Sequence, residues 1–164
     1  MVASDNSIQT LFAAAPDTTQ VYKFDAGAGQ FLAAAFKVGG IWINGTANLL
    51  PGEAAFVNNG TQTPFTITFV GNVNQGSLTN SLVAGFNLIS SQVPQAGLLE
   101  TDLNAPVSNG EQVYRFISGA YEPAYSKVAG IWLPSQPQID VGEGFWISKI
   151  AGANWTRTFD VNNP

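Results

Sequence analysis

The residues best able to do chemistry in this chain are carboxylates, because the chain has no histidine and no cysteine. Without imidazole or thiol groups, a Ser-His-Asp triad, a thiol nucleophile and zinc sites that use His or Cys are excluded. Glu53 and Glu143 each follow a glycine and precede an apolar segment. If they faced each other, they could form the carboxylate pair of a glycosidase. The alternative is structural, with each glutamate accepting backbone N–H bonds from an adjacent turn.

The occurrence of this glutamate in both halves of the chain favours the structural role. We therefore predict no catalytic residue, and the chain is not expected to be an enzyme. Calcium at Asp25 or Asp102 has no Asp-x-Asp-x-Asp run to support it, so no metal or cofactor is predicted either. Gly27-Ala28-Gly29 opens no helix and carries no lysine, which is unlike a phosphate-binding loop.

Three further side chains are candidates for interactions. Arg157 falls on the otherwise apolar face of a predicted strand, so we expect it to pair with Glu143 on the neighbouring strand. The alternative is an edge position from which the arginine reaches water. Tyr121 and Tyr125 do not recur in the other half, and exposed rings of this kind could stack on sugar rings.

These residues belong to a pattern that occurs twice, which predicts a packed β framework and not a chemical site. Apolar, aromatic and glycine positions recur while the residues between them differ. The first block recurs after 92 residues (21 to 113) and the others after 90 (40 to 130), so the copies should differ by one small loop change. The blocks span 21–24, 40–42, 52–57 and 65–69 in the first copy, and 113–116, 130–132, 142–147 and 155–159 in the second.

Alternating apolar residues and turn signals predict an all-β protein with one short N-terminal helix at 4–15. We expect two pseudo-symmetric modules, 1–76 and 77–164, each a β-sandwich or partly open barrel, packed together as one unit. Residues 75–82 are expected to be a polar connection. Strands are predicted at 20–25, 30–37, 41–43, 53–58, 64–71, 85–90, 111–117, 123–128, 130–133, 143–149 and 154–161.

The first copy lacks the opening strand that the second copy has at 85–90, since its counterpart would lie before Met1. A sheet short of one strand exposes unpaired N–H and C=O groups, which are a template for another chain. We therefore expect intermolecular contacts from both ends of the chain. The residues predicted to make them are Met1, Val2, Ala3, Ser4, Val161, Asn162, Asn163 and Pro164.

The composition is typical of extracellular β proteins. Charged residues make up only 10% of the chain and its net charge is −5, with six basic residues scattered singly, so nucleic-acid binding is not expected. No apolar run is long enough to span a membrane, and no signal peptide follows Met1. The absence of cysteine fits a protein exported by bacteria.

Three segments resemble a family of uncharacterised secreted β domains from environmental bacteria of the Verrucomicrobia and Planctomycetes type, often found as tandem copies in large exported proteins. The segments are 85–97, 141–147 and 155–159. The resemblance implies an exported, β-rich, non-enzymatic module. The leading hypothesis is thus an extracellular or cell-surface subunit that associates with copies of itself into a fibre or layer. Binding of a surface polysaccharide through Tyr121 and Tyr125 is the alternative, and a carboxylate-only hydrolase comes third.

Overall fold

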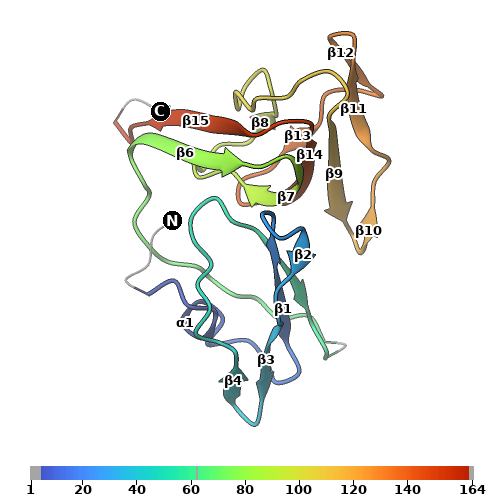
Figure 1. Cartoon of the computed structure of the whole chain (residues 1–164). Coiled ribbons are helices and arrows are strands. Elements are labelled where there is room, and N and C mark those ends of the chain that lie inside the picture. The colour runs from blue at the N-terminus through green and yellow to red at the C-terminus, as the bar shows by residue number, and fades with distance from the viewer. Residues whose placement is uncertain (1–4, 62, 163–164) are drawn as a thin grey trace.

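The computed structural model describes residues 5–61 and 63–162. It is an all-β protein, with 43% of its residues in strands and one short helix, and its described residues form several antiparallel sheets and no closed barrel. In Figure 1 the chain forms a lower part, with the helix and the first five strands, and an upper part with the others. We call residues 5–75 the first half and residues 76–162 the second half.

The first half is organised around one strand that pairs with three others. β1 pairs β5 on one side and, successively, β3 and β2 on the other, and β4 extends the sheet beyond β3. The elements are α1 (Ile8–Leu11), β1 (Gln20–Asp25), β2 (Gln30–Phe31), β3 (Ala35–Val38), β4 (Ile41–Ile43) and β5 (Ala55–Asn58).

The second half contains a sheet with the order β12-β11-β9-β14-β7, with β10 also paired to β9, and two smaller pairs, β6 with β15 and β8 with β13. Its strands are β6 (Gly76–Leu82), β7 (Gly85–Ser90), β8 (Gly97–Leu98), β9 (Gln112–Ile117), β10 (Ala120–Tyr121), β11 (Tyr125–Val128), β12 (Ile131–Leu133), β13 (Gln138–Ile139), β14 (Gly144–Lys149) and β15 (Ala153–Phe159).

The strand pairings of the first half recur in the second half in the same register. Val21 faces Val57 across β1 and β5, and Val113 faces Ile147 across β9 and β14. The β3–β4 and β11–β12 pairings correspond residue by residue at an offset of 90. The predicted loop change lies between the first two strands of each sheet. Four residues, 26–29, join β1 to β2, whereas only two, 118–119, join β9 to β10.

One predicted strand and one predicted connection are wrong. Residues 64–71 form no strand, although Phe65 and Ile67 do pack inward against the core and Phe69 meets Phe12 edge to face at 5.4 Å. The alternation correctly indicated a buried face, but no neighbouring strand is present to pair with this segment among the described residues. The predicted polar connection at 75–82 is instead β6, which pairs with β15 over seven residue pairs.

Two other predicted elements are shorter than expected. The strand predicted at 30–37 is divided into β2 and β3, because each pairs with a different stretch of β1. The helix predicted at 4–15 is one turn, Ile8–Leu11. The N–H groups of Ile8 and Gln9 donate to the carbonyls of Ala47 and Gly45, so tertiary bonds fix this segment.

Each half has its own core. The larger core, in the second half, centres on Phe145, Ile147 and Val113, all fully buried. The smaller one packs the helix against the first sheet. It consists of Ile8, Phe12, Ala15, Val21 and Ala35.

Candidate functional site

Aromatic side chains from both halves meet around Trp146, in the middle of β14. The ring of Phe24 lies 4.7 Å from it between centroids, that of Phe31 5.9 Å and that of Phe56 6.2 Å. Phe86 of the second half lies 6.0 Å away. The halves are thus joined by an aromatic cluster and not by a flexible linker.

The ring contacts between the halves are reciprocal. At the offsets of the repeat, Phe24 corresponds to Phe116 and Phe56 to Trp146. The contact of Phe24 with Trp146 is matched by that of Phe116 with Phe56, whose centroids are 5.3 Å apart. The contact of Phe31 with Trp146 is matched in the same way by Tyr121 with Phe56, at 6.4 Å.

One side of this cluster is hollowed into a groove of about 600 Å³, which we call the aromatic groove. This volume is in the range of small-molecule sites. Its most exposed rings are Tyr121 (54%) and Phe86 (48%), an unusual exposure for large aromatic side chains. The groove is lined by Phe24, Gly29, Phe86, Tyr114, Tyr121, Glu122, Ala124 and Trp146.

The two predicted sugar-binding tyrosines differ in their surroundings. Tyr121 is exposed in the aromatic groove, where its hydroxyl accepts a 3.0 Å hydrogen bond from Trp146 Nε1. Tyr125 is half-buried against the core of the second half and donates its hydroxyl proton to Glu122 at 2.9 Å. That hydrogen bond, with burial, raises the pKa of Tyr125. Of these two tyrosines, Tyr121 is the one whose ring is available to a ligand in the groove.

An ion cluster borders the aromatic groove. Arg115 donates two hydrogen bonds to Glu143, at 2.7 and 2.9 Å, and a longer one of 3.3 Å to Glu122. The bonds to Glu143 raise the pKa of Arg115 above its ordinary value, so the guanidinium stays charged. Such a forked pair is among the stronger charge-assisted contacts, and it anchors β9 to the turn before β14.

The predicted ion pair between Glu143 and Arg157 is wrong. Glu143 pairs with Arg115, whose backbone lies opposite Phe145 in the β9–β14 register. Arg157 donates instead to Gln95 Oε1 at 2.6 Å and to Ser91 Oγ at 3.3 Å, and burial lowers its pKa. Its strand pairs with β6, which leads it away from Glu143.

Glu53 and Glu143 have the structural role expected of them. Each accepts a hydrogen bond from a backbone N–H three residues earlier, Leu50 at 2.7 Å and Asp140 at 2.9 Å. Each also pairs with a cation at equivalent positions, Lys23 for Glu53 and Arg115 for Glu143. Both carboxylates thus join a backbone N–H of the preceding turn to a cation on the neighbouring strand.

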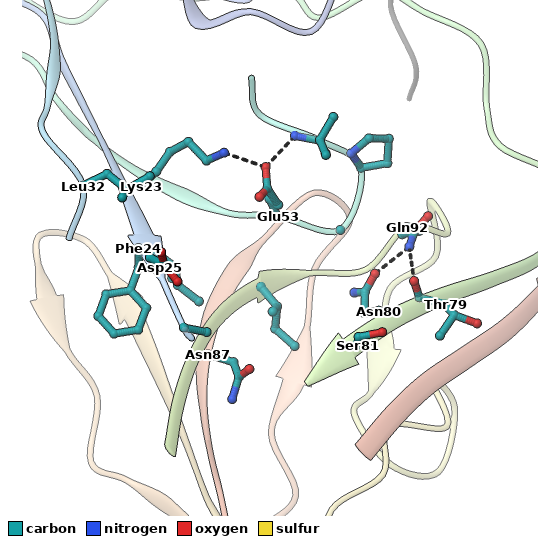
Figure 2. Close-up of a pocket in the computed structure, with 16 residues that line it drawn as sticks. Lys23, Phe24, Asp25, Leu32, Glu53, Thr79, Asn80, Ser81, Asn87 and Gln92 are labelled. Carbon is teal, nitrogen blue, oxygen red and sulfur yellow. Dashed lines mark hydrogen bonds and ion pairs between the residues drawn. The ribbon is translucent and has the colours of Figure 1, made fainter. Parts of the chain in front are cut away.

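A second hollow, of about 420 Å³, lies between the halves and is lined by polar and apolar residues. Figure 2 shows Lys23 and Glu53 on one side of this pocket, and Asn80, Gln92 and Thr79 on the other. Gln92 Nε2 donates to Asn80 Oδ1 at 2.6 Å and to the Thr79 carbonyl at 3.0 Å. The labelled polar groups on each side of the pocket thus bond to one another: Lys23 to Glu53, and Gln92 to Asn80 and Thr79.

Two β-ribbons with an apolar outer face form the other notable surface. We call β3–β4 the first ribbon and β11–β12 the second ribbon. Ile41 (66% exposed) and Ile131 (65%) occupy equivalent positions in them. Neither β4 nor β12 pairs with a further strand in the described part of the chain, so both are edge strands. The exposed apolar residues are Phe36, Val38, Ile41 and Ile43 in the first ribbon, and Val128, Ile131 and Leu133 in the second.

Tight turns hold both ribbons in shape. Gly39 and Gly40 connect β3 to β4 with φ angles of 58° and 77°, and Ala129 and Gly130 connect β11 to β12 with 49° and 82°. Two successive positive φ angles are characteristic of type I′ turns, whose twist suits a two-stranded ribbon. The ribbons lie at opposite ends of the molecule, the first at the bottom and the second at the upper right of Figure 1.

The chain ends expected to make assembly contacts are described only in part. Met1, Val2, Ala3, Ser4, Asn163 and Pro164 lie outside the described residues. Val161 is half exposed, and its N–H donates to Gln75 Oε1 at 3.3 Å, while Asn162 is exposed. Their role in assembly stays a prediction, as does the division of the chain into domains 1–76 and 77–164.

Searches against protein-family models, curated proteins and solved structures found no match to this chain. The resemblance to secreted tandem β domains therefore stays a prediction. Within residues 5–61 and 63–162, no helix is long and apolar enough to cross a membrane. The same residues contain no group of three or more acidic side chains placed to hold a metal ion.

Sequence reasoning missed the aromatic groove and the two ribbons, although signals for both were present. The rings that meet between the halves, two of which line the groove, recur as the pairs Phe24 with Phe116 and Phe56 with Trp146. An aromatic position repeated in each copy can serve a contact between copies as well as a core within each. The repeated isoleucine after each ribbon turn likewise indicated an apolar edge.

Proposed function

We propose that this protein is a non-enzymatic structural subunit of an extracellular or cell-surface assembly, whose copies join through the edge strands of the two ribbons. The observation that carries the proposal is the matched apolar edges of β4 and β12, with Ile41 and Ile131 about two thirds exposed. An exposed apolar edge strand is unfavourable in a monomer and pairs readily with another strand. Sheet completion between copies would bury both the apolar side chains and the free backbone groups.

The position of the ribbons gives the assembly its form. Each copy has two joining surfaces at opposite ends, so growth can continue in both directions (Figure 1). Contacts that do not close into a ring produce fibres. No charged residue occurs in β4 or β12, so little charge repulsion opposes their approach.

We further propose that the two halves are pseudo-symmetric copies of one β module. The support is the identical register of their pairings and the reciprocal ring contacts between them. Pseudo-symmetry explains why the molecule has two similar ribbons. A single module would have one such edge and could form only a pair.

Carbohydrate binding through Tyr121 and Tyr125 is less well supported as a function. Tyr121 has the exposed ring that stacking on a sugar requires, but Tyr125 is half-buried with its hydroxyl bonded to Glu122. A glycan array with Tyr121→Ala and Tyr125→Ala tests this alternative. Binding that needs Tyr121 and not Tyr125 would agree with the exposures.

Sedimentation velocity over a concentration series tests the structural proposal. We expect the natural sequence to form species that grow with concentration. The double variant Ile41→Lys/Ile131→Lys should stay monomeric, because a charge on each edge disfavours strand pairing. Each single variant should stop at small species, since one joining surface remains.

Ile150→Lys is the matched control, because Ile150 is 66% exposed but belongs to the turn after β14 and to neither ribbon. It should assemble like the natural sequence. A natural sequence that is monomeric at every concentration would overturn the proposal. So would a double variant that assembles as well as the Ile150→Lys control.

A further inference from the structure

The walls of the aromatic groove meet at right angles and form a corner. The ring planes of Phe24 and Trp146 are inclined at 81°, and those of Phe86 and Trp146 at 85°. A sugar ring stacks best on a flat platform of aromatic faces. A compact cation is instead held well by rings that surround it on several sides, because each ring face carries negative charge density.

The charge beside the groove is also negative. Arg115, Glu122 and Glu143 form one cluster with one positive and two negative charges, a net charge of −1. Glu143 is engaged by two short bonds from Arg115. Glu122 accepts a longer bond from Arg115 and a 2.9 Å bond from the Tyr125 hydroxyl, both at Oε2, and its side chain is 32% exposed. Glu122 lines the groove, so its carboxylate is the charge that a ligand would meet.

The other polar groups of the groove are occupied by one another. Trp146 Nε1 donates to the Tyr121 hydroxyl at 3.0 Å, and the Tyr114 hydroxyl donates to Gln112 Oε1 at 2.7 Å. A sugar requires several free donors and acceptors for its hydroxyl groups, and the groove has few. A methylated ammonium group requires none, because it is recognised by ring faces and a nearby carboxylate.

We propose that the aromatic groove binds a methylated ammonium group, with the exposed rings of Phe86 and Tyr121 beside the cation, Trp146 beneath it as the buried floor of the groove, and Glu122 as its counter-charge. The groove is large enough for the cation together with part of the molecule that carries it. This site lies between the halves and not on the ribbons, so it does not depend on the proposed assembly.

Choline and its neutral isostere 3,3-dimethylbutan-1-ol test the proposal, because they share a shape and differ in charge. Titrations followed by the NMR signal of the Trp146 indole N–H, assigned with Trp146→Phe, report binding in the groove. The monomeric Ile41→Lys/Ile131→Lys background keeps the assembly out of the measurement if assembly occurs. We expect choline to bind about 10-fold more tightly than the isostere, as cation–π contacts allow.

Two variants and a control separate the contribution of the Glu122 charge from that of the Phe86 ring. Glu122→Gln should weaken choline severalfold and leave the isostere unchanged, whereas Phe86→Ala should weaken both. Asp160→Asn removes an acidic charge near the C-terminus and should change neither. Equal affinity for choline and the isostere, or no response of Trp146 to choline, would overturn the proposal. Binding of methyl glucoside in preference to choline would overturn it in favour of a sugar site.

Discussion

The strand pairings of the first half recur in the second half, but the two halves differ in the hydrogen bonding of their buried polar groups. In the second half, Glu111 and Lys149 form an ion pair in which both residues are at least 95% buried. The position in the first half that corresponds to Glu111 is Thr19, whose buried hydroxyl makes no hydrogen bond within the described residues. The strand pairings that the two halves share therefore form without the ion pair.

The tryptophans of the two ribbons show the same contrast. Trp132 Nε1 donates to Glu100 at 2.9 Å, and Glu100 also pairs with Lys127. The corresponding Trp42 Nε1 is buried without a hydrogen bond in the described part of the chain. The second half thus has ion pairs where the first half has buried polar atoms without a hydrogen bond among the described residues, so substitutions at these positions should affect the two halves differently.

The largest effect is expected from Glu111→Gln. The substitution leaves the ammonium group of Lys149 buried without a counter-charge, which costs roughly 3–5 kcal/mol. Thr19→Val at the corresponding position of the first half should change the free energy of unfolding by less than about 1 kcal/mol, because its hydroxyl makes no bond to lose. Urea unfolding measures both. Similar losses in the two variants would contradict the contrast between the halves.

An intermediate effect is expected where the halves touch. A Cβ atom added at Gly144 would lie 2.6 Å from the Cβ of Ala54, its corresponding residue in the first half. Gly144→Ala should therefore destabilise the protein by about 1–3 kcal/mol through overpacking.

The exchange variant Ala54→Gly/Gly144→Ala is the control for this prediction, because it restores one methyl group at the contact. It should recover part of the lost stability in urea unfolding. If the double variant were less stable than Gly144→Ala by the full cost of placing a glycine at position 54, the two positions would not pack on each other.

The smallest effect concerns acid stability. Although burial acts to raise it, hydrogen bonds from Lys127 and Trp132 hold the pKa of Glu100 below its ordinary value of 4.5. A lowered carboxyl pKa contributes stability that is present above the unfolded pKa and is lost as pH falls through the folded pKa. Between pH 5 and about pH 3, Glu100→Gln should thus lose less stability than the natural sequence. An equal or steeper loss would contradict this assignment.

Much of the framework could be predicted from the sequence, because the apolar and glycine positions that occur in both copies mark the strands and their order. The repeat even predicted the two-residue loop change between β1–β2 and β9–β10. Strand pairing could not be predicted in the same way. Residues 64–71 alternate between apolar and polar side chains like a strand, but no strand pairs with them among the described residues. The polar segment 76–82 forms β6 because it pairs with β15.

The ion pair of Glu143 could have been predicted correctly. The basic residues Lys23 and Arg115 recur at the same offset as the strand that carries them, and Glu53 and Glu143 recur with their own strands. A charge pair recorded in both copies indicates a contact within each copy. Arg157 has no basic counterpart, since Ile67 occupies its place, and it is bonded to neutral groups.

The repeat indicates which aromatic positions recur, but it does not predict that a groove forms beside them. The groove forms where two similar surfaces meet, and that meeting depends on tertiary packing that neither copy specifies alone. Glu122 is an example of a groove residue that the repeat does not predict. Its counterpart in the repeat is Leu32, so the charge beside the groove belongs to one half only.

Thiol cross-linking tests the central claim most directly, because the chain has no cysteine of its own. A chain with Ile41→Cys and Ile131→Cys, treated with a short bis-maleimide, should give a ladder of covalent multimers, since each copy presents one thiol at each joining edge. The same reaction with Ile150→Cys and Val141→Cys, which place exposed thiols elsewhere, should leave mostly single chains. Single chains from the ribbon variant, or equal ladders from both, would contradict assembly through the ribbon edges.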